Sequence, residues 1–311
     1  MARNFTWRDI PTLPRYRKQQ VFLDTSLSLT YAPGILLGVL QSLIFIENFC
    51  IATHSLPNQE TDDLIGQVCH SAHKTSAHLT FIAPKNALAH SDVVKLLTHL
   101  CRQAGERGAL WVLAEVEEGT KLTEHLLRAG FTPYAEQSIW RFPAGIQGTS
   151  SPLAWKPVSA RDLGEIHSLY QKLIPSAVRR IEPPPTASDL QGLVCRHNGE
   201  LVGYAAAQFG PKGVLLDVLL DTSQNGTQAH LTAIRQNLPL TRQQPVYVRV
   251  RTYQQKLATA LESLQSSSSP TQIVMVKKLS ANYQVKQTFN LPVLEQQPDV
   301  STPFVNSESK S

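Results

Sequence analysis

Residues 77–142 alternate short apolar runs with amphipathic segments, and this alternation limits the fold class. Ala77–Pro84 and Ala109–Val116 are short and apolar, which is typical of buried strands. Apolar residues at helical spacing predict helices over Ser91–Ala104 and Lys121–Ala129. Strands that alternate with helices tend to pair in parallel, so this stretch predicts an α/β unit.

Glycines mark the ends of both predicted helices. Gly105 and Gly130 stand where the helical patterns stop, and glycine readily adopts the left-handed conformation of a helix C-terminus. In the second helix, Leu126 and Leu127 are expected to face the core. The aromatic-rich run Phe131–Phe142 that follows predicts a final hairpin.

The pattern of the first half recurs in the second half. The matched segments are 8–10 with 161–163, Ile65-Gly66 with Val202-Gly203, and 110–116 with 245–251. The last two pairs are separated by nearly the same number of residues, which favours duplication over chance. Asn198-Gly199 also predicts a tight hairpin turn within the second copy.

The repeat divides the chain into two copies of one unit. We predict an N-terminal domain over residues 1–145, a linker over 146–152, a C-terminal domain over 153–293 and a disordered tail over 294–311. The linker is rich in Gly and Ser, and the tail is polar. A chain of 311 residues is long enough for two domains that each bury a core.

Composition describes a globular protein with a weak basic excess. Hydrophobic residues make up 42% of the chain, charged residues 17%, and the net charge is +5. This excess comes without a recognition motif or a basic run, so no nucleic-acid partner is expected. The most apolar run, Ile35–Ile46, is too short to cross a bilayer, and residues 1–11 lack the apolar core of a signal peptide. We expect no membrane partner and a cytoplasmic location; the oligomeric state stays open.

The four cysteines are Cys50, Cys69, Cys101 and Cys195. They show neither CxxC spacing nor a histidine at metal-ligand spacing, so no metal site is expected. Most lie in apolar runs, which is typical of small buried side chains in a reducing compartment.

The order of elements in the first copy resembles the GNAT superfamily of acyl-CoA-dependent N-acyltransferases. A strand ends at Pro84, and a helix, a strand and a second helix follow. Leu127–Phe131 (LRAGF) resembles the phrase that ends the family's last helix, and Gly66 resembles the glycine of its central hairpin, where the strand passes under the cofactor.

The resemblance implies a tandem bacterial member with two GNAT-like domains. Each domain would hold a mixed, mostly antiparallel sheet with a parallel central pair flanked by helices. It also implies acetyl-CoA as co-substrate, bound between the fourth and fifth strands of one copy. The acetyl group would pass directly to an amine of a small molecule or peptide.

In this family, a loop after the fourth strand binds the cofactor pyrophosphate through backbone N–H groups at a helix N-terminus. It needs Gln/Arg-x-x-Gly-x-Gly/Ala so that the backbone can approach the phosphates. The first copy offers Pro84–Asp92, which contains no glycine. Its candidate cofactor-binding residues are Ala83, Lys85 and Asn86.

The second copy offers residues 224–229 for the same loop. Gln224 matches the start of the motif, Thr227 replaces its central glycine, and Gly226 lies one position away. The candidate cofactor-binding residues here are Gln224, Asn225, Gly226 and Thr227. The alternative is an ordinary turn before a helix.

Acyl transfer needs a base to deprotonate the amine and an acid to protonate the CoA thiolate. Glu115 and Glu47 are candidate bases on strands, and Tyr253 is a candidate acid at a strand-to-helix turn. In the first copy Leu126 occupies the position of the family tyrosine. The structural alternatives are an exposed or rim carboxylate for Glu115 and a simple helix-start residue for Tyr253.

Arg249 and Arg251 alternate with valines, so together with Tyr247 they give one strand a basic face. This face could bind a phosphate or an acidic substrate. Alternatively, the charges could protect an edge strand from aggregation.

Two functions stay open. The first is an N-acetyltransferase in which one copy works; the second is a catalytically inactive tandem protein that senses a ligand or associates with proteins. The glycine-free loop and Leu126 favour inactivity for the first copy, whereas residues 224–229 favour an active second copy. An open gap between parallel strands would favour the enzyme, and a gap filled by side chains would favour the inactive protein.

Overall fold

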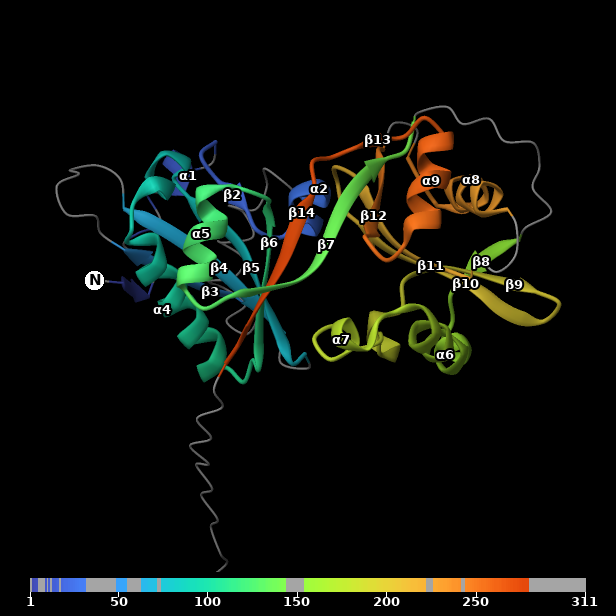
Figure 1. The fold of residues 1–311 in the computed structure, drawn as a ribbon, viewed down its shortest axis with the longest axis horizontal. Helices are drawn as coiled ribbons and strands as arrows, with labels where there is room; N and C mark the ends of the chain where they lie inside the picture. Colours follow the sequence, from blue (N-terminus) through green and yellow to red (C-terminus); the bar gives the residue numbers. More distant parts are fainter. Residues whose placement is uncertain are drawn as a thin grey trace, which may run out of the picture. The chain divides into compact units, whose positions relative to one another are not determined.

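The structure is a computed structural model, and it describes residues 2–4, 9, 11, 13–16, 18–31, 49–54, 63–71, 74–143, 154–221, 226–241 and 244–279. The described strands form one mixed sheet (Figure 1). Their order is β1-β3-β4-β5-β6-β14-β7-β12-β11-β10-β9-β8, while β2 pairs with β5 and β13 pairs with β7.

The strands of the first half of the chain are β1 (Ala2–Asn4), β2 (Val21–Phe22), β3 (Phe49–His54), β4 (Leu64–His70), β5 (Ser76–Ala83), β6 (Trp111–Glu117) and β7 (Thr132–Arg141). Those of the second half are β8 (Trp155–Pro157), β9 (Gly192–His197), β10 (Glu200–Phe209), β11 (Val214–Leu220), β12 (Val246–Arg251), β13 (Ser267–Ser268) and β14 (Gln272–Lys278).

The α-helices are α1 (Leu13–Tyr16), α2 (Thr25–Thr30), α4 (Val93–Glu106), α5 (Lys121–Arg128), α6 (Leu163–Leu173), α7 (Ser176–Arg179), α8 (Thr227–Asn237) and α9 (Gln255–Ser263). Short 3-10 turns cover Lys85–Ala89, Ala160–Asp162 and Ala187–Asp189.

The described sheet contains two parallel pairs, one in each half. β5 runs parallel to β6 and β11 runs parallel to β12, while the other pairings are antiparallel. This confirms the predicted fold class, two tandem copies of a mostly antiparallel sheet with a parallel central pair flanked by helices.

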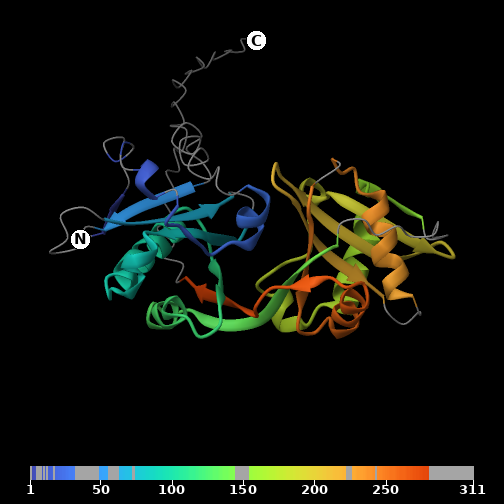
Figure 2. The same ribbon diagram turned by 90° about the horizontal axis from the view of Figure 1, so that it is seen from above.

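The two copies exchange strands at the centre of the sheet. β14, the last strand of the second copy, lies between β6 and β7, and β7 pairs in turn with β12. Figures 1 and 2 show β14 and β7 side by side. Each half of the sheet therefore contains a strand from the other half of the chain.

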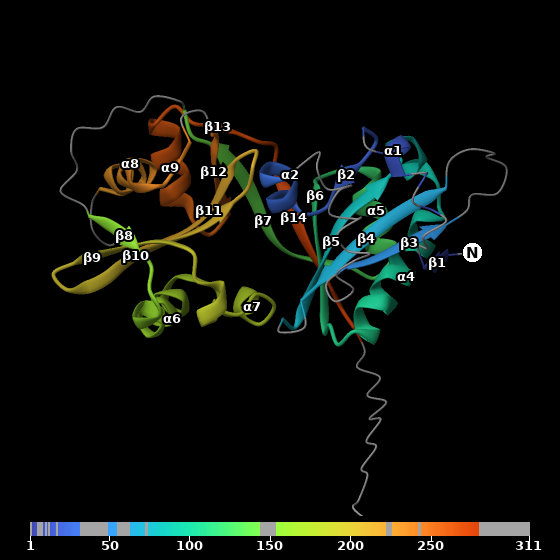
Figure 3. The same ribbon diagram turned by 180° about the vertical axis from the view of Figure 1, so that it is seen from behind.

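Helices cover both faces of the sheet. On one face α4 and α5 enclose the first apolar core, and α8 and α9 enclose the second. On the other face α6 packs against β10 and β11, and Figures 1 and 3 show it opposite α8 and α9. Successive side chains of a strand point to opposite faces of the sheet, so one strand can contribute to an apolar core on each face.

The matched glycines allow close packing in both copies. A Cβ at Gly66 would lie 2.8 Å from Cδ1 of Leu100, and a Cβ at Gly203 would lie 2.6 Å from Cη2 of Trp155. Both glycines therefore make room for neighbouring side chains, whereas the resemblance had implied room for a cofactor.

The ends of the first predicted helix differ from expectation. α4 continues past Gly105 to Glu106, and Gly108 takes the left-handed conformation with φ +93°. Gly130 has φ +87°, which confirms it as the stop of α5. The prediction that Leu127 is buried was wrong, because its side chain is 50% exposed.

Two further turn predictions had opposite outcomes. The predicted hairpin in Phe131–Phe142 was wrong, because this run forms the single strand β7, whose neighbours come from the second half of the chain. The Asn198-Gly199 turn is confirmed: both residues have positive φ, 51° and 88°.

Several predictions lie outside the described residues: the linker 146–152, the tail 294–311, Glu47, Gln224 and Asn225. Within the described residues, no group of His, Cys, Asp and Glu side chains could hold a metal ion. No described helix is both long and apolar enough to cross a membrane.

Candidate active site

The parallel strands of the second copy separate halfway along their length. β11 and β12 pair from Val214 and Val246 up to Asp217 and Arg249. Beyond that point the gap is bridged by Gln254, whose Nε2 donates a hydrogen bond to the carbonyl oxygen of Val218 (2.8 Å). The two strands thus leave a slot, and the side chain of Gln254 crosses it.

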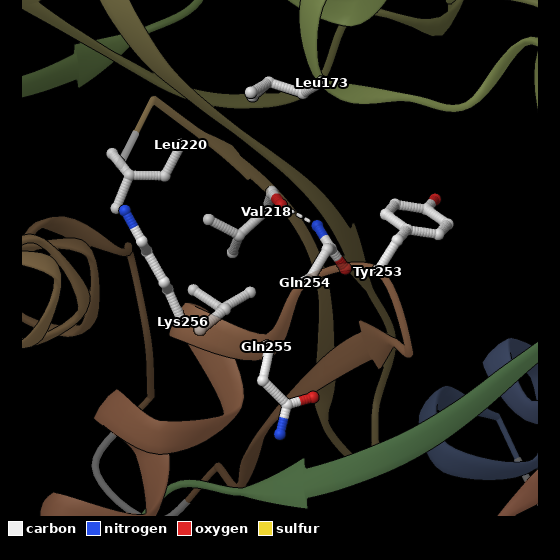
Figure 4. A pocket seen from close by; sticks show the side chains of 8 residues that line it. Leu173, Val218, Leu220, Tyr253, Gln254, Gln255 and Lys256 are labelled. Atoms are coloured by element: carbon white, nitrogen blue, oxygen red, sulfur yellow. Dashed lines mark hydrogen bonds between the residues drawn. The ribbon is translucent and has the colours of Figure 1, made fainter. Parts of the chain in front are cut away.

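A pocket of about 230 Å³ lies at this opening (Figure 4). Its lining residues are Leu173, Val218, Leu220, Tyr253, Gln254, Gln255, Lys256 and Leu257. In Figure 4, Gln254 reaches toward Val218, and the Tyr253 ring lies beside it. Val218 and Leu220 make the β11 side of the slot apolar, which suits a flexible part of a ligand that carries few charges.

A larger cavity of about 780 Å³ lies next to this pocket. Val218, Tyr253 and Gln254 line both spaces, so they mark the junction. The cavity is bounded by both halves of the sheet and by residues 182–191.

The basic face of β12 points into the cavity. Arg249 and Arg251 line it, while Val246, Val248 and Val250 pack into the core on the opposite face. This confirms the predicted alternation. The edge-strand alternative was wrong, because β12 lies between β7 and β11.

Each arginine of this face is held by carboxylates. Arg249 lies 3.6 Å from Glu115 and 3.6 Å from Asp217, and Arg251 lies 2.8 Å from Glu182. Tyr134 also donates a hydrogen bond to Glu182. The charges of the cavity therefore form a connected set.

Glu115 is buried, so its interpretation as an exposed or rim carboxylate was wrong. Burial alone would raise the pKa of Glu115, but the charge of Arg249 and a hydrogen bond from Thr25 N–H (2.8 Å) lower it to about 2. A carboxylate with so low a pKa is a poor proton acceptor. The surroundings of Glu115 suit a structural anion that holds Arg249.

Asp217 has the properties of a base that Glu115 lacks. The protein around Asp217 removes part of its hydration and so raises its pKa above the ordinary value, and the charges of Arg249 and Arg251 offset part of that rise. Sequence reasoning missed Asp217. The available signal was a single acid within the apolar run VLLDVLL.

Tyr253 lies at the junction of pocket and cavity. Burial raises its pKa to about 12, so its hydroxyl stays protonated at neutral pH. The side chain is 36% exposed and lines both spaces. A protonated phenol at this place can donate a proton to a leaving group.

Comparisons of the whole fold point to one architecture. The tandem GNAT protein from the clavulanic acid biosynthesis pathway superposes with a TM-score of 0.55 at 12% identity, over 89% of this chain and 98% of that chain. A GCN5-related N-acetyltransferase from Sphaerobacter thermophilus gives 0.54 at 11% identity, over 89% and 95%. A putative acetyltransferase from Pyrococcus horikoshii gives 0.51 at 8% identity, over 90% of each chain.

This chain has the tandem GNAT fold. No protein-family model matches its sequence, and no curated protein does. The likeness to solved structures therefore establishes the fold, and any activity has to be argued from the site.

The GNAT fold makes β11 and β12 the fourth and fifth strands of the second copy, and α8 the helix between them. Gly226 precedes α8 in the left-handed conformation with φ +117°, and Thr227 is its first residue. Gly226 has no side chain that could cap the first turn. The first N–H groups of α8 therefore have no side-chain cap from Gly226.

The corresponding gap of the first copy is filled by the chain itself. β5 and β6 pair only from Ser76 and Trp111 to His78 and Leu113. Farther along, the N–H of Leu23 donates to the carbonyl oxygen of Thr80 (2.9 Å). The N–H of Glu115 donates to the carbonyl oxygen of Leu23 (2.8 Å).

The segment around Leu23 thus acts as an inserted strand. Leu23 is 1% exposed and belongs to the first core, and Val21 and Phe22 pair with β5. The backbone groups that face the gap are therefore satisfied by the protein's own chain. No room remains there for an extended ligand along β5.

The candidate cofactor residues of the first copy lie beside this filled gap. Ala83 is buried, the N–H of Lys85 donates to the carbonyl oxygen of Gln19 (2.8 Å), and Asn86 is exposed. They remain predictions from sequence.

Proposed function

We propose that the second copy transfers an acetyl group from acetyl-CoA to an amine, and that the first copy binds no acetyl-CoA. The observation that carries this proposal is the contrast between the two gaps. A pocket lies at the gap between β11 and β12 and shares wall residues with a polar cavity, whereas the gap between β5 and β6 holds Leu23.

The slot of the second copy suits the parts of acetyl-CoA. Gly226 and Thr227 would place helix N–H groups against the pyrophosphate. Val218 and Leu220 would contact the flexible arm that carries the thioester. For this arm to enter, Gln254 must release the carbonyl oxygen of Val218, which an amide of the arm can then satisfy.

The reaction would take place at the junction of pocket and cavity. Asp217 accepts a proton from the ammonium form of the acceptor, and the free amine attacks the thioester carbonyl carbon. The new C–N bond forms and the C–S bond breaks. Tyr253 donates its proton to the departing thiolate. The attacking nitrogen, which has already lost one proton to Asp217, then loses its second proton to the tyrosinate, and Asp217 releases its proton to solvent. Glu115, the base predicted from sequence, instead holds Arg249.

A second function is favoured by one observation. The side chain of Gln254 bridges the gap through its hydrogen bond to Val218, and such a bridged gap also suits a protein that senses a ligand without catalysis. A protein of this kind would transfer no acetyl group to any amine, whether or not it binds acetyl-CoA. A turnover assay separates the two functions.

The proposal is tested by calorimetric titration of acetyl-CoA into the full chain and two variants. Thr227→Glu adds a negative charge at the first turn of α8, where it suits the helix but repels phosphate. We expect binding to weaken at least about tenfold. Ser91→Glu makes the same kind of change before α4 in the first copy, and we expect binding to stay as in the wild type. Equal effects of both variants, or loss with Ser91→Glu alone, would refute the assignment to the second copy.

A further inference from the structure

The residues that line the larger cavity indicate which acceptor it can hold. This inference rests on the proposed function. We infer that the acceptor is a compact amine with an apolar or aromatic body and without a carboxylate. Three observations support this class of acceptor independently: the charges of the cavity wall, the exposure of Asp217, and the apolar and aromatic side chains of the wall.

The cations of the described cavity wall are all committed to carboxylates. Lys74 lies 3.2 Å from Asp189, Arg251 lies 2.8 Å from Glu182, and Arg249 lies between two carboxylates. Three cations, Lys74, Arg249 and Arg251, therefore face four carboxylates, Glu115, Glu182, Asp189 and Asp217. A carboxylate on the acceptor would find no unpaired Lys or Arg among the described wall residues and would meet a surplus of negative charge.

The arginines offer no hidden anion site. Nε of Arg249 and Nη1 of Arg251 have no hydrogen-bond partner, but both atoms are enclosed and have almost no exposed surface. A molecule in the cavity therefore cannot reach them without moving the protein around them.

Asp217 is the most exposed of the four carboxylates. Its side chain is 39% exposed, compared with 10% for Glu115, 30% for Glu182 and 32% for Asp189, which pairs with Lys74. Among the described residues its one ion pair is the 3.6 Å contact to Arg249, which Arg249 shares with Glu115. An ammonium group would add the missing positive charge next to the junction.

The remaining wall suits an apolar body. Tyr134, Tyr170, Tyr204 and Tyr253 line the cavity, together with Pro183–Pro185. Glu182 holds the hydroxyl groups of Tyr134 and Tyr170, one through its side chain and one through its carbonyl oxygen. Rings fixed in this way can pack against an aromatic body and attract a cation.

The size of the cavity sets an upper limit. About 780 Å³ is in the range of sites that hold one drug-sized molecule. An acceptor that fits entirely inside, next to the thioester, is therefore a small molecule.

Two amines that differ only in a carboxylate test the inference. 2-Phenylethylamine and phenylalanine are titrated into the full wild-type chain, with and without acetyl-CoA. We expect 2-phenylethylamine to bind at least about tenfold more tightly. Equal binding of the two, tighter binding of phenylalanine, or no binding of 2-phenylethylamine at millimolar concentration would overturn the inference.

A matched pair of variants locates the ammonium group. Asp217→Asn should weaken 2-phenylethylamine binding at least about tenfold, because a neutral amide replaces the carboxylate. Asp221→Asn, just beyond the end of the same strand, is the control. Asp221 pairs with Lys172 at 2.6 Å and is not part of the cavity wall. Unchanged binding by Asp217→Asn with a wild-type melting temperature would contradict the assignment.

The acetyl-CoA titration keeps the two proposals distinguishable. If 2-phenylethylamine binds as expected but acetyl-CoA does not, the proposed transfer fails and the amine site stands. If acetyl-CoA binds but the two amines bind equally, the acceptor class fails and the transfer stands.

Discussion

Glu115 shows how one side chain connects distant parts of the chain. It accepts a hydrogen bond from Thr25 N–H and lies 3.6 Å from Arg249. The position of Glu115 on a strand could be predicted from sequence. Its partners could not, because they lie about 90 residues before it and more than 130 residues after it in the chain. The same reason hid Asp217, whose role depends on a cavity built from both halves.

The low pKa of Glu115 has a consequence for acid stability. Its pKa falls from 4.5 to about 2 on folding, so its contribution is present above pH 4.5 and is lost as the pH drops toward 2. We expect the free energy of unfolding of the wild type to fall by on the order of 3 kcal/mol across this range. Glu115→Gln should lack this part of the fall, as measured by urea unfolding at each pH.

Glu106→Gln is the control for this experiment. Glu106 is 65% exposed and lies 3.8 Å from Arg102, so its removal should change the pH profile little. The account of Glu115 is wrong if the wild type and Glu115→Gln lose equal stability between pH 4.5 and 2.

Tyr253 is expected to act in the chemical step. Tyr253→Phe removes the proton donor but keeps the ring, so kcat for acetyl transfer should fall about 100-fold while acetyl-CoA binding stays unchanged. Release of the CoA thiol with 2-phenylethylamine as acceptor measures kcat. Tyr247→Phe, on the same face of β12 but outside the cavity wall, should retain activity. An unchanged kcat in Tyr253→Phe would remove the tyrosine from the mechanism.

At the scale of elements, local patterns were predicted well and non-local pairings were not. The helices α5, α8 and α9 and most strands follow from periodicity and turn residues. The insertion of Val21–Leu23 into the first gap could not be foreseen. Three residues carry no periodic signal, and their position depends on the separation of β5 and β6.

The two strand glycines allow a prediction at this scale. Gly203→Ala places a methyl group 2.6 Å from the rigid ring of Trp155, whereas Gly66→Ala meets the flexible end of Leu100 at 2.8 Å. We expect Gly203→Ala to lower the free energy of unfolding by about 1–3 kcal/mol, and Gly66→Ala by less. Denaturant titration of both variants checks the order. A larger loss in Gly66→Ala would contradict this packing account.

At the scale of the molecule, the exchange of β7 and β14 makes the halves interdependent. The sequence repeat predicted two copies, and the sheet has two copies. The repeat could not predict that β14 would pair with β6 and β7. A last strand that stayed within its own copy would show the same hydrophobic pattern as one that pairs with the first copy.

The exchange predicts that the first half cannot fold by itself. A fragment of residues 1–143 lacks β14, so β6 and β7 lose the strand that joins them. We expect the fragment to lack a cooperative unfolding transition in circular dichroism, whereas the full chain shows one. A fragment that unfolds cooperatively with the stability of the full chain would show that the exchange is dispensable.

The central claim is that one gap admits acetyl-CoA and the other is closed. Hydrogen exchange with and without saturating acetyl-CoA tests it in a single experiment. We predict that peptides covering residues 216–221 and 252–258 gain protection, while those covering 78–83 and 113–117 are already protected and do not change. Protection gained in the first gap, or no change in either gap, would contradict the account.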